Sequence, residues 1–422
     1  MLFNSLSFII LVVITLIIYY LPKFERFQIP TLVVSSFVFY AYHNPTLLVL
    51  LLSSITINIL ASYYVYHGPQ KYEKAIATTG VVLNIAILAF FKYSPLIGRT
   101  FLTPSNDLFH FLVSIPLPIG ISFFTFQGIS LMIDTFRHKN EMGISHLYSN
   151  NLKEHALNIL LYKSFFPQLI AGPIVKAHDF IPQIKRKYFY DIKWDLAFGS
   201  LVTGYFLKMV IADNLKDYTF YIQYPYFLEY SSLTLLAMLF GYSIQIFADF
   251  AGYSLIAIGT SYLFGYNIMQ NFNFPYISKS FSEFWTRWHI SLSTFLKEYL
   301  YIPLGGNRKG KYRTYLNLFT VMTLGGLWHG AAWSYAIWGM YHGTLLMIEK
   351  ALGKTIRITH TKTGRVAKIL LMFFMVSMGW LLFKLPNFND VILFCTTLFK
   401  NRFFDGQMRD LLYIFMYSID II

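Results

Sequence analysis

A histidine lies inside a long apolar stretch, and its neighbours are small residues. The stretch Thr323–Trp333 reads TLGGLWHGAAW and contains His329. Burial among apolar groups disfavours the imidazolium ion, so His329 is expected to be neutral near pH 7 and able to take a proton from an attacking hydroxyl. The glycines and alanines leave room for a substrate or another helix to approach closely. The competing interpretation is that His329 only forms a hydrogen bond between helices.

A second histidine lies in an aromatic stretch upstream of the first. The segment Glu283–Ser293 reads EFWTRWHISLS. A helix through it would place Trp285, Trp288 and His289 on one face. Glu283 and Arg287 would lie on another face, four residues apart, and could neutralise each other. The alternative is an interfacial helix with an aromatic belt, but a belt needs no histidine.

A basic, glycine-rich loop follows this aromatic stretch. Gly305 and the pair Gly310–Lys311 have the spacing of a phosphate-binding loop. However, Tyr312 stands where such a loop needs Ser or Thr, and no strand is predicted before it. A solvated cytoplasmic loop is the simpler interpretation. It could still contact the phosphates of an acyl donor, through Arg308, Lys309 and Lys311.

Other polar residues within apolar runs cost free energy unless they are paired or hydrated. Asp249, in the run Phe247–Ser254, is the best functional candidate among them. No HxxxH or HExxH pattern occurs and His342 is thirteen residues from His329, so no metal site is predicted. A hydrolase GxSxG motif is also absent from the sequence. The residues predicted to line or support the site are Trp285, Trp288, Asn317, Trp328, Asp249 and His342.

The composition indicates whether the chain folds in water or in a membrane. Hydrophobic residues make up 56% of it and charged residues 13%, against roughly 25% charged residues in a soluble domain. Apolar runs of about 15 to 22 residues recur throughout, near the length that crosses a bilayer as a helix. The single cysteine, Cys395, excludes a disulfide within the chain and a thiolate metal site. The sequence therefore predicts an all-α integral membrane protein, with an uncleaved first helix over 2–21.

The net charge of +14 could suggest a nucleic-acid partner. The basic residues instead gather in short loops on alternate connections between apolar runs, which is typical of cytoplasmic loops. This pattern places the N-terminus outside the cell membrane. About eleven spans are expected, given boundary errors of ~2–4 residues. They lie near residues 2–21, 29–42, 45–66, 77–93, 115–136, 195–213, 231–265, 314–328, 330–349, 366–384 and 388–399.

Two regions are apolar or aromatic but interrupted. Residues 156–175 contain two prolines, and residues 270–306 mix aromatics with Asn, Arg, Glu and His. Broken backbone at membrane depth is tolerated only where it is buried in protein or lines a wet cavity. We therefore expect re-entrant or interfacial helices around a central tunnel, within one membrane domain over 1–422. The last residues, Leu411–Ile422, look like an unfinished span.

Taken together and in this order, the motifs resemble the membrane-bound O-acyltransferase family, and within it the alginate and peptidoglycan O-acetyltransferase membrane subunits. The resemblance covers most of residues 115–345. It rests on Pro118–Gln127, Phe166–Val175, Phe247–Ser254, Asn271–Ile277, Phe284–Ser293, Leu300–Lys309, Gly325–Trp333 and Trp338–Gly343.

The resemblance implies roles for the two histidines and a route for the acyl group. His329 takes the place of the family's catalytic histidine, and His289 that of the second polar residue of the site. The expected co-substrate is acetyl-coenzyme A or another acyl thioester that approaches from the cytoplasm, with no bound cofactor. The acceptor would be a polysaccharide outside a bacterial inner membrane, reached with an esterase-like extracytoplasmic partner. D-alanyl transfer to teichoic acid is the alternative. A non-enzymatic export permease is a more distant one, and the inverted repeats typical of permeases are not visible.

Overall fold

The structure is a computed structural model that describes residues 1–138, 151–352, 361–402 and 406–419. The described residues form helices joined by turns and loops, and no strand occurs among them. The all-α prediction is confirmed. Parts of two predicted cytoplasmic loops, at 139–150 and 353–360, lie outside the described residues, as do 403–405 and 420–422 near the predicted C-terminal spans.

The chain divides into two compact units. Unit 1 comprises Met1–Gly204 and Tyr253–Gln270, and unit 2 comprises Tyr205–Gly252 and Asn271–Ile422. Two of the three boundaries fall inside helical segments, α10 (Trp194–Tyr205) and the long helix α12 (Ser232–Leu263), and each of these helices contributes residues to both units.

Unit 1 contains the N-terminal helices. In chain order they are α1 (Leu6–Tyr20), η1 (Pro22–Phe27), α2 (Gln28–Ala41), α3 (Thr46–His67), α4 (Gln70–Phe101), α5 (Asp107–Ser114), α6 (Ile121–His138), α7 (Leu152–Ser164), α8 (Phe166–Leu169), α9 (Ala177–Phe180), η3 (Ile181–Gln183), η4 (Phe189–Asp191) and α10 (Trp194–Tyr205). The side chains of Asn58 in α3 and Asn84 in α4 exchange two hydrogen bonds of 3.1 Å. A Cβ on Gly128 of α6 would collide with both amides, so this glycine lets the three helices meet.

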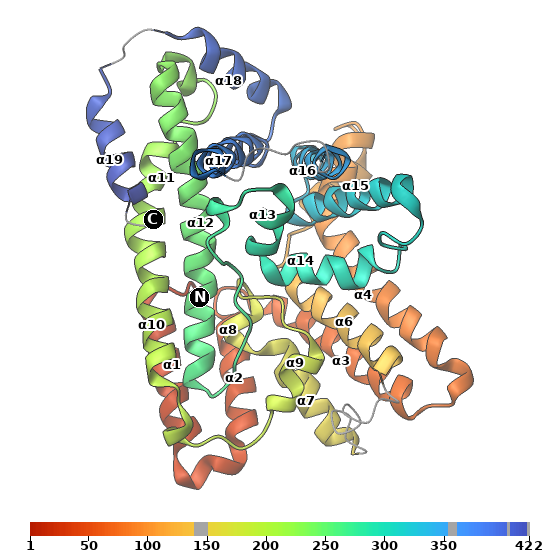
Figure 1. Ribbon diagram of the computed structural model, residues 1–422. Coiled ribbons are helices and arrows are strands. Elements are labelled where there is room, and N and C mark those ends of the chain that lie inside the picture. The colour runs from red at the N-terminus through yellow and green to blue at the C-terminus, as the bar shows by residue number, and fades with distance from the viewer. Residues whose placement is uncertain (139–150, 353–360, 403–405, 420–422) are drawn as a thin grey trace. The chain divides into compact units, whose positions relative to one another are not determined.

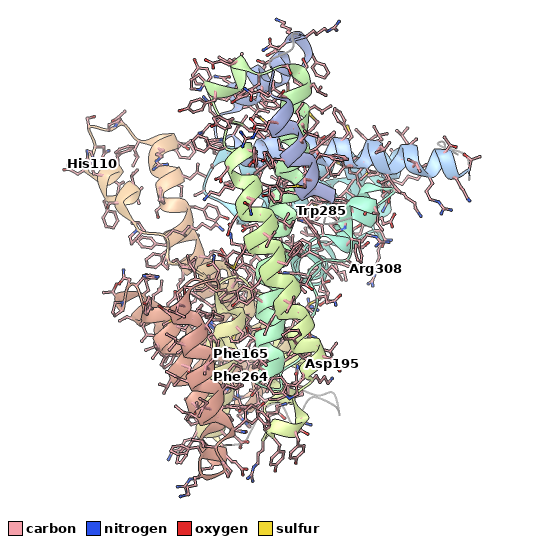
Figure 2. All side chains as sticks on the ribbon, turned by 90° about the vertical axis from the view of Figure 1, so that its left-hand side faces the viewer. His110, Phe165, Asp195, Phe264, Trp285 and Arg308 are labelled. Atoms are coloured by element: carbon pink, nitrogen blue, oxygen red, sulfur yellow. The ribbon has the colours of Figure 1, made fainter. Side chains whose placement is uncertain are left out.

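The predicted interruption at 156–175 is confirmed. Helix α7 ends at Ser164, the single-turn α8 carries Pro167, and irregular chain follows it. Proline lacks an N–H and restricts the residue before it, which explains the break. The broken chain is buried among rings: Phe165 lies 5.0 Å from Tyr266 and Phe166 lies 5.7 Å from Phe264, between ring centroids. Figure 2 shows Phe165 and Phe264 close together in this interior.

Unit 2 contains the C-terminal helices and most of the residues singled out above. They are the π-helix η5 (Phe206–Ala212), α11 (Asp213–Thr219), η6 (Tyr226–Glu229), η7 (Pro275–Ile277), α13 (Phe281–Arg287), α14 (Ile290–Leu296), the π-helix η8 (Lys297–Tyr301), α15 (Gly310–His329), α16 (Trp333–Leu352), α17 (Lys362–Lys384), α18 (Phe388–Lys400) and α19 (Met408–Ile419). The predicted interruption at 270–306 is confirmed, since only short helices occur there. Helices α15 and α16 lie side by side, with α13 and α14 next to them (Figure 1).

Several helices are long and apolar enough to cross a membrane. Among the described residues there are five, or up to six if the bent pair of α1 with η1–α2, which turns by 103°, counts as one span. These helices have the length and apolar composition of membrane spans. The number of about eleven spans stays a prediction. The five are Thr46–His67, Gln70–Phe101, Trp194–Thr219, Ser232–Leu263 and Lys362–Lys384.

Candidate active site

The predicted helix through residues 283–293 is wrong, because the chain breaks at its middle. Helix α13 ends at Arg287, Trp288 is extended, and His289 adopts the left-handed conformation (φ 43°, ψ 57°) before α14 begins at Ile290. The backbone of Asn271 takes part in the break: its carbonyl accepts the Ile290 N–H at 2.9 Å. The N–H that would continue the helix is thus bonded elsewhere. Consequently the expected shared face of Trp285, Trp288 and His289 does not form on one helix.

The break orients His289. Asn271 Oδ1 accepts hydrogen bonds from the Ser291 backbone N–H at 3.2 Å and from Ser291 Oγ at 2.7 Å. Because a backbone N–H can only donate, the atom facing it is the amide oxygen. His289 Nδ1 lies 3.2 Å from this same oxygen, so Nδ1 carries the proton and donates it. In the neutral ring Nε2 then keeps its lone pair, and this buried atom has no hydrogen-bond partner among the described residues.

His329 lies close to His289, so the two predicted catalytic residues come together in unit 2. Their ring centroids are 6.5 Å apart. His329 ends α15, where its ring contacts Trp328 at 5.0 Å, Trp338 at 5.1 Å and Phe383 at 5.3 Å. His289 is fully buried, whereas His329 is partly exposed. His329 is therefore the more accessible of the two imidazoles.

The glycines around His329 serve helix packing. A Cβ on Gly326 would collide with the Tyr335 carbonyl oxygen, and one on Gly339 would collide with the Met322 carbonyl oxygen. The ring of Tyr335 fills the space beside Gly330. Of the two uses predicted for small residues here, close approach of a helix is the one observed at these positions.

Aromatic side chains surround the two histidines. Trp285 lies 5.3 Å from His342, and Trp338 lies 4.9 Å from His342 and 5.5 Å from Trp380, between ring centroids. His342 is fully buried, and neither of its ring nitrogens has a hydrogen-bond partner among the described residues. The ring of Trp338 contacts both His342 and His329. No direct ring contact joins His342 to His329 among the described residues. Trp288 packs against Trp380 at 4.9 Å.

The remaining candidates have structural partners. Asp249 Oδ1 lies 2.7 Å from Lys208 Nζ, which also pairs with Asp213 at 2.6 Å. This ion cluster ties the π-helix η5 to α12. Asn317 donates to the Gly306 carbonyl at 2.9 Å and thereby anchors the loop before α15. Asp249 and Asn317 thus make these polar contacts outside the ring contacts of the two histidines.

The basic loop is exposed and lacks the strand–loop–helix setting of the nucleotide-binding phosphate loop. The π-helix η8 precedes it, where such a motif requires a strand. Gly305, Gly306 and Gly310 have positive φ, which suits tight turns. Arg308, Lys309 and Lys311 are all exposed on this loop and at the start of α15. In Figure 2 Arg308 lies apart from Trp285, which belongs to the aromatic cluster.

The predicted pair of Glu283 and Arg287 is confirmed. Arg287 Nε donates to Glu283 Oε1 at 3.0 Å, and the carboxylate also accepts the Lys279 N–H at 2.9 Å. Partial burial alone would raise the pKa of the Glu283 carboxyl. The Lys279 N–H and the Arg287 guanidinium outweigh burial and lower that pKa below its ordinary value. The ion pair joins the first and last turns of α13, whose N-cap is Ser280.

Sequence reasoning missed four residues of the site. Asn271 and Ser291 orient His289, while Trp380 and Phe383 of α17 complete the aromatic surround. Asn271 lies eighteen residues before His289, and no helical periodicity links them. An asparagine in an aromatic, apolar segment was the one available signal, since such a residue is costly without a partner.

Comparison with known proteins identifies the family of this chain. The model of the membrane-bound O-acyltransferase family matches residues 35–389. The peptidoglycan O-acetyltransferase of Helicobacter pylori is 36% identical over 383 residues, which cover 86% of this chain and 72% of that protein. The probable alginate O-acetylase of Pseudomonas aeruginosa is 37% identical over 92% of this chain and 72% of its own length. The teichoic acid D-alanyltransferase of Bacillus subtilis is 28% identical over 78% of this chain and 83% of its own length.

The chain belongs to the membrane-bound O-acyltransferase family. It is a membrane enzyme, an O-acyltransferase, and its most similar relatives include O-acetyltransferases of peptidoglycan and alginate. The resemblance inferred from its motifs is confirmed.

Proposed function

We propose that this enzyme transfers an acetyl group from cytosolic acetyl-coenzyme A to a hydroxyl of an extracytoplasmic polysaccharide. The relatives named as acetyl-transferring enzymes are 36% and 37% identical to this chain, against 28% for the named D-alanyltransferase. This difference favours acetyl over D-alanyl transfer. The observation that carries the chemistry is the proximity of His329 to a second imidazole, His289, whose proton position is fixed.

The reaction requires one proton to change places. The acceptor hydroxyl oxygen forms a bond to the thioester carbonyl carbon, and the carbon–sulfur bond breaks. The hydroxyl proton is taken up by an imidazole and passed to the departing thiolate, so that an ester and a free thiol result. General-base catalysis of this kind contributes roughly 10²–10⁴-fold to the rate.

His329 is the general base in this proposal, and His289 positions it or relays the proton. Rings with centroids 6.5 Å apart can both touch one small reacting group placed between them. His289 is suited to relay because Asn271 holds the proton on Nδ1 and leaves Nε2 able to accept one. Asn271 acts on the reaction only through His289 and is a positioning residue.

The setting of the reaction is part of the proposal. The basic loop with Arg308, Lys309 and Lys311 faces the cytoplasm of a bacterial inner membrane and meets the phosphates of the donor. The N-terminus lies outside, about eleven helices cross the bilayer, and the acyl group passes through a tunnel. An esterase-like extracytoplasmic partner hands the acyl group to the polymer.

Labelled donors test this function in membrane vesicles that contain the protein, its partner and the polymer. Radiolabelled acetyl-coenzyme A is supplied to inverted and to right-side-out vesicles, and the label in the polymer fraction is counted. Label should enter the polymer only in inverted vesicles, whose cytoplasmic face is accessible to this impermeant donor. Labelled D-alanine with its activating system serves as the matched donor. Incorporation of D-alanine alone, or of acetyl groups equally in both orientations, would contradict the proposal.

A further inference from the structure

Unit 1 contains a cavity that is lined only by residues of that unit and by neither of the two histidines. It has a volume of about 510 Å³ and opens where η1 meets the segment before η4. Four basic side chains line it: Lys23, Arg26, Lys185 and Arg186. Glu25 is the one acidic residue of the lining and pairs with Arg186. The cavity therefore carries a clear excess of positive charge and selects an anion.

The floor of this cavity is fixed by hydrogen bonds. The buried Gln28 side chain donates to the Lys187 carbonyl at 2.7 Å and to the Tyr19 carbonyl at 3.2 Å, and it accepts the Lys187 N–H at 3.0 Å. Tyr266, also in the lining, is buried. The two segments that supply the basic residues are thus clamped together, and the charges are held near one another without a ligand.

A further charge lies beneath the floor. Lys187 Nζ is 5.0 Å from the centre of the Tyr266 ring, and the residue is buried. Burial, with the charge of Lys185, lowers the pKa of Lys187 to about 8. The amine is still mostly protonated at neutral pH, which adds to the positive potential of the cavity.

The rim of the cavity is amphipathic. Side chains three apart eclipse each other in a 3₁₀-helix, so η1 places Lys23 and Arg26 in one row. Phe24 and Phe27 form the next row, and they are 43% and 42% exposed. The element connects two apolar helices, α1 and α2. Basic groups beside exposed aromatic rings on such a connection are typical of a membrane–water interface.

We propose that this cavity binds the phosphate headgroup of an anionic phospholipid, whose acyl chains run along Phe24 and Phe27. The basic cavity selects the phosphate, and the exposed rings favour a ligand that carries apolar chains over a soluble one. A headgroup bound here joins η1 to the 185–187 segment and so stabilises unit 1. The inference does not depend on the reaction proposed for the histidine site.

Native mass spectrometry of the full-length protein in detergent tests the proposal. Phosphatidylglycerol and phosphatidylcholine with identical acyl chains are titrated in turn, each in the absence and presence of excess inorganic phosphate at matched ionic strength. The variant is Lys23→Gln with Arg26→Gln, both at exposed positions. The control is Lys71→Gln with Lys74→Gln, an equally exposed basic pair at the start of α4.

Phosphatidylglycerol should bind in preference to phosphatidylcholine and resist inorganic phosphate. The cavity variant should bind it about tenfold more weakly, and the control variant should bind it like the wild type. Equal binding of the two lipids, or equal loss in both variants, would show only non-specific attraction and would overturn the proposal. Displacement of phosphatidylglycerol by inorganic phosphate would overturn it as well, because the cavity would then be a site for a soluble phosphate compound.

Discussion

The side-chain oxygen of Asn271 fixes the tautomer of His289. That oxygen accepts from Ser291 twice and from His289 once, so rotation of the amide would place its NH₂ against a backbone N–H. The cost of such a buried mismatch is about 1–3 kcal/mol. The arrangement thus resembles, in physical terms, the carboxylate that holds the tautomer of a catalytic histidine.

Asn271→Ala should lower kcat about tenfold or more and leave KM for the acyl donor nearly unchanged, because the tautomer of His289 is no longer fixed. Asn271→Asp keeps an acceptor for both Ser291 and His289 and should restore part of kcat. Steady-state acyl transfer measures both. Equal losses in the two variants at equal thermal stability would contradict the positioning role.

The sequence indicates the two histidines as candidate residues but does not indicate the backbone break at His289. His329 and His289 stand out because histidine is rare and costly in apolar stretches. The left-handed conformation of His289 has no local sequence signal, since it results from the pairing of Ile290 with Asn271. Periodicity alone therefore predicts one continuous helix over residues 283–293. Tertiary contacts break that helix at His289.

At the scale of elements, the packing of α15 on α16 sets the position of His329. Gly326 and Gly339 bring the backbones of these helices into direct contact beside the site. A larger residue at either position would push α16, and with it Trp338, away from His329. The glycines were visible in the sequence, but whether a helix or a substrate occupies the space beside them was not.

Gly339→Ala should destabilise the protein by about 1–3 kcal/mol, because the new methyl group overpacks against α15. The matched control is Gly199→Ala in α10, where no atom lies within 4 Å of the added Cβ. That control should be neutral or slightly stabilising, since alanine favours helix. Thermal unfolding in detergent measures both. A Gly339 variant as stable as the control would rule out the close contact.

A titratable contact joins α9 to α6. His178 Nδ1 lies 2.9 Å from Asp134 Oδ2, and Asp179 is nearby at 3.5 Å. The hydrogen bond to Asp134, opposed by partial burial and aided by the charges of both carboxylates, raises the pKa of His178 above its ordinary value. The stabilisation is therefore full below the unfolded pKa of about 6.5 and is lost as pH rises through the folded pKa.

His178→Ala should consequently destabilise the protein more at about pH 6 than at about pH 9. The two losses in free energy of unfolding should differ by about 1 kcal/mol, because His178 is partly exposed and solvent weakens the interaction. His110→Ala, at an exposed position in α5, is the matched control and should show no such difference. Thermal unfolding at the two pH values measures the effect. A larger effect at the higher pH would reverse the sign and refute the ion pair.

At the scale of the whole molecule, hydropathy predicted the class and left the count of spans open. Long apolar helices such as α3 and α12 are recognisable from length alone. Shorter ones such as α6, α14 and α18 fall near or below a bilayer's thickness, so their role depends on how they pack. The interrupted regions were predictable because prolines and polar residues disrupt the apolar pattern. Their internal contacts were not.

The acyl transfer proposed for this membrane enzyme should depend on His329, and labelled donor shows directly whether it does. Transfer of label from radiolabelled acetyl-coenzyme A to polymer is compared among wild type, His329→Ala and His110→Ala, at equal protein levels in the membrane and with the partner supplied. His329→Ala should lose at least roughly 100-fold in rate, as expected for removal of a general base. His110→Ala should match the wild type. Full activity of the His329 variant would contradict a catalytic role for His329.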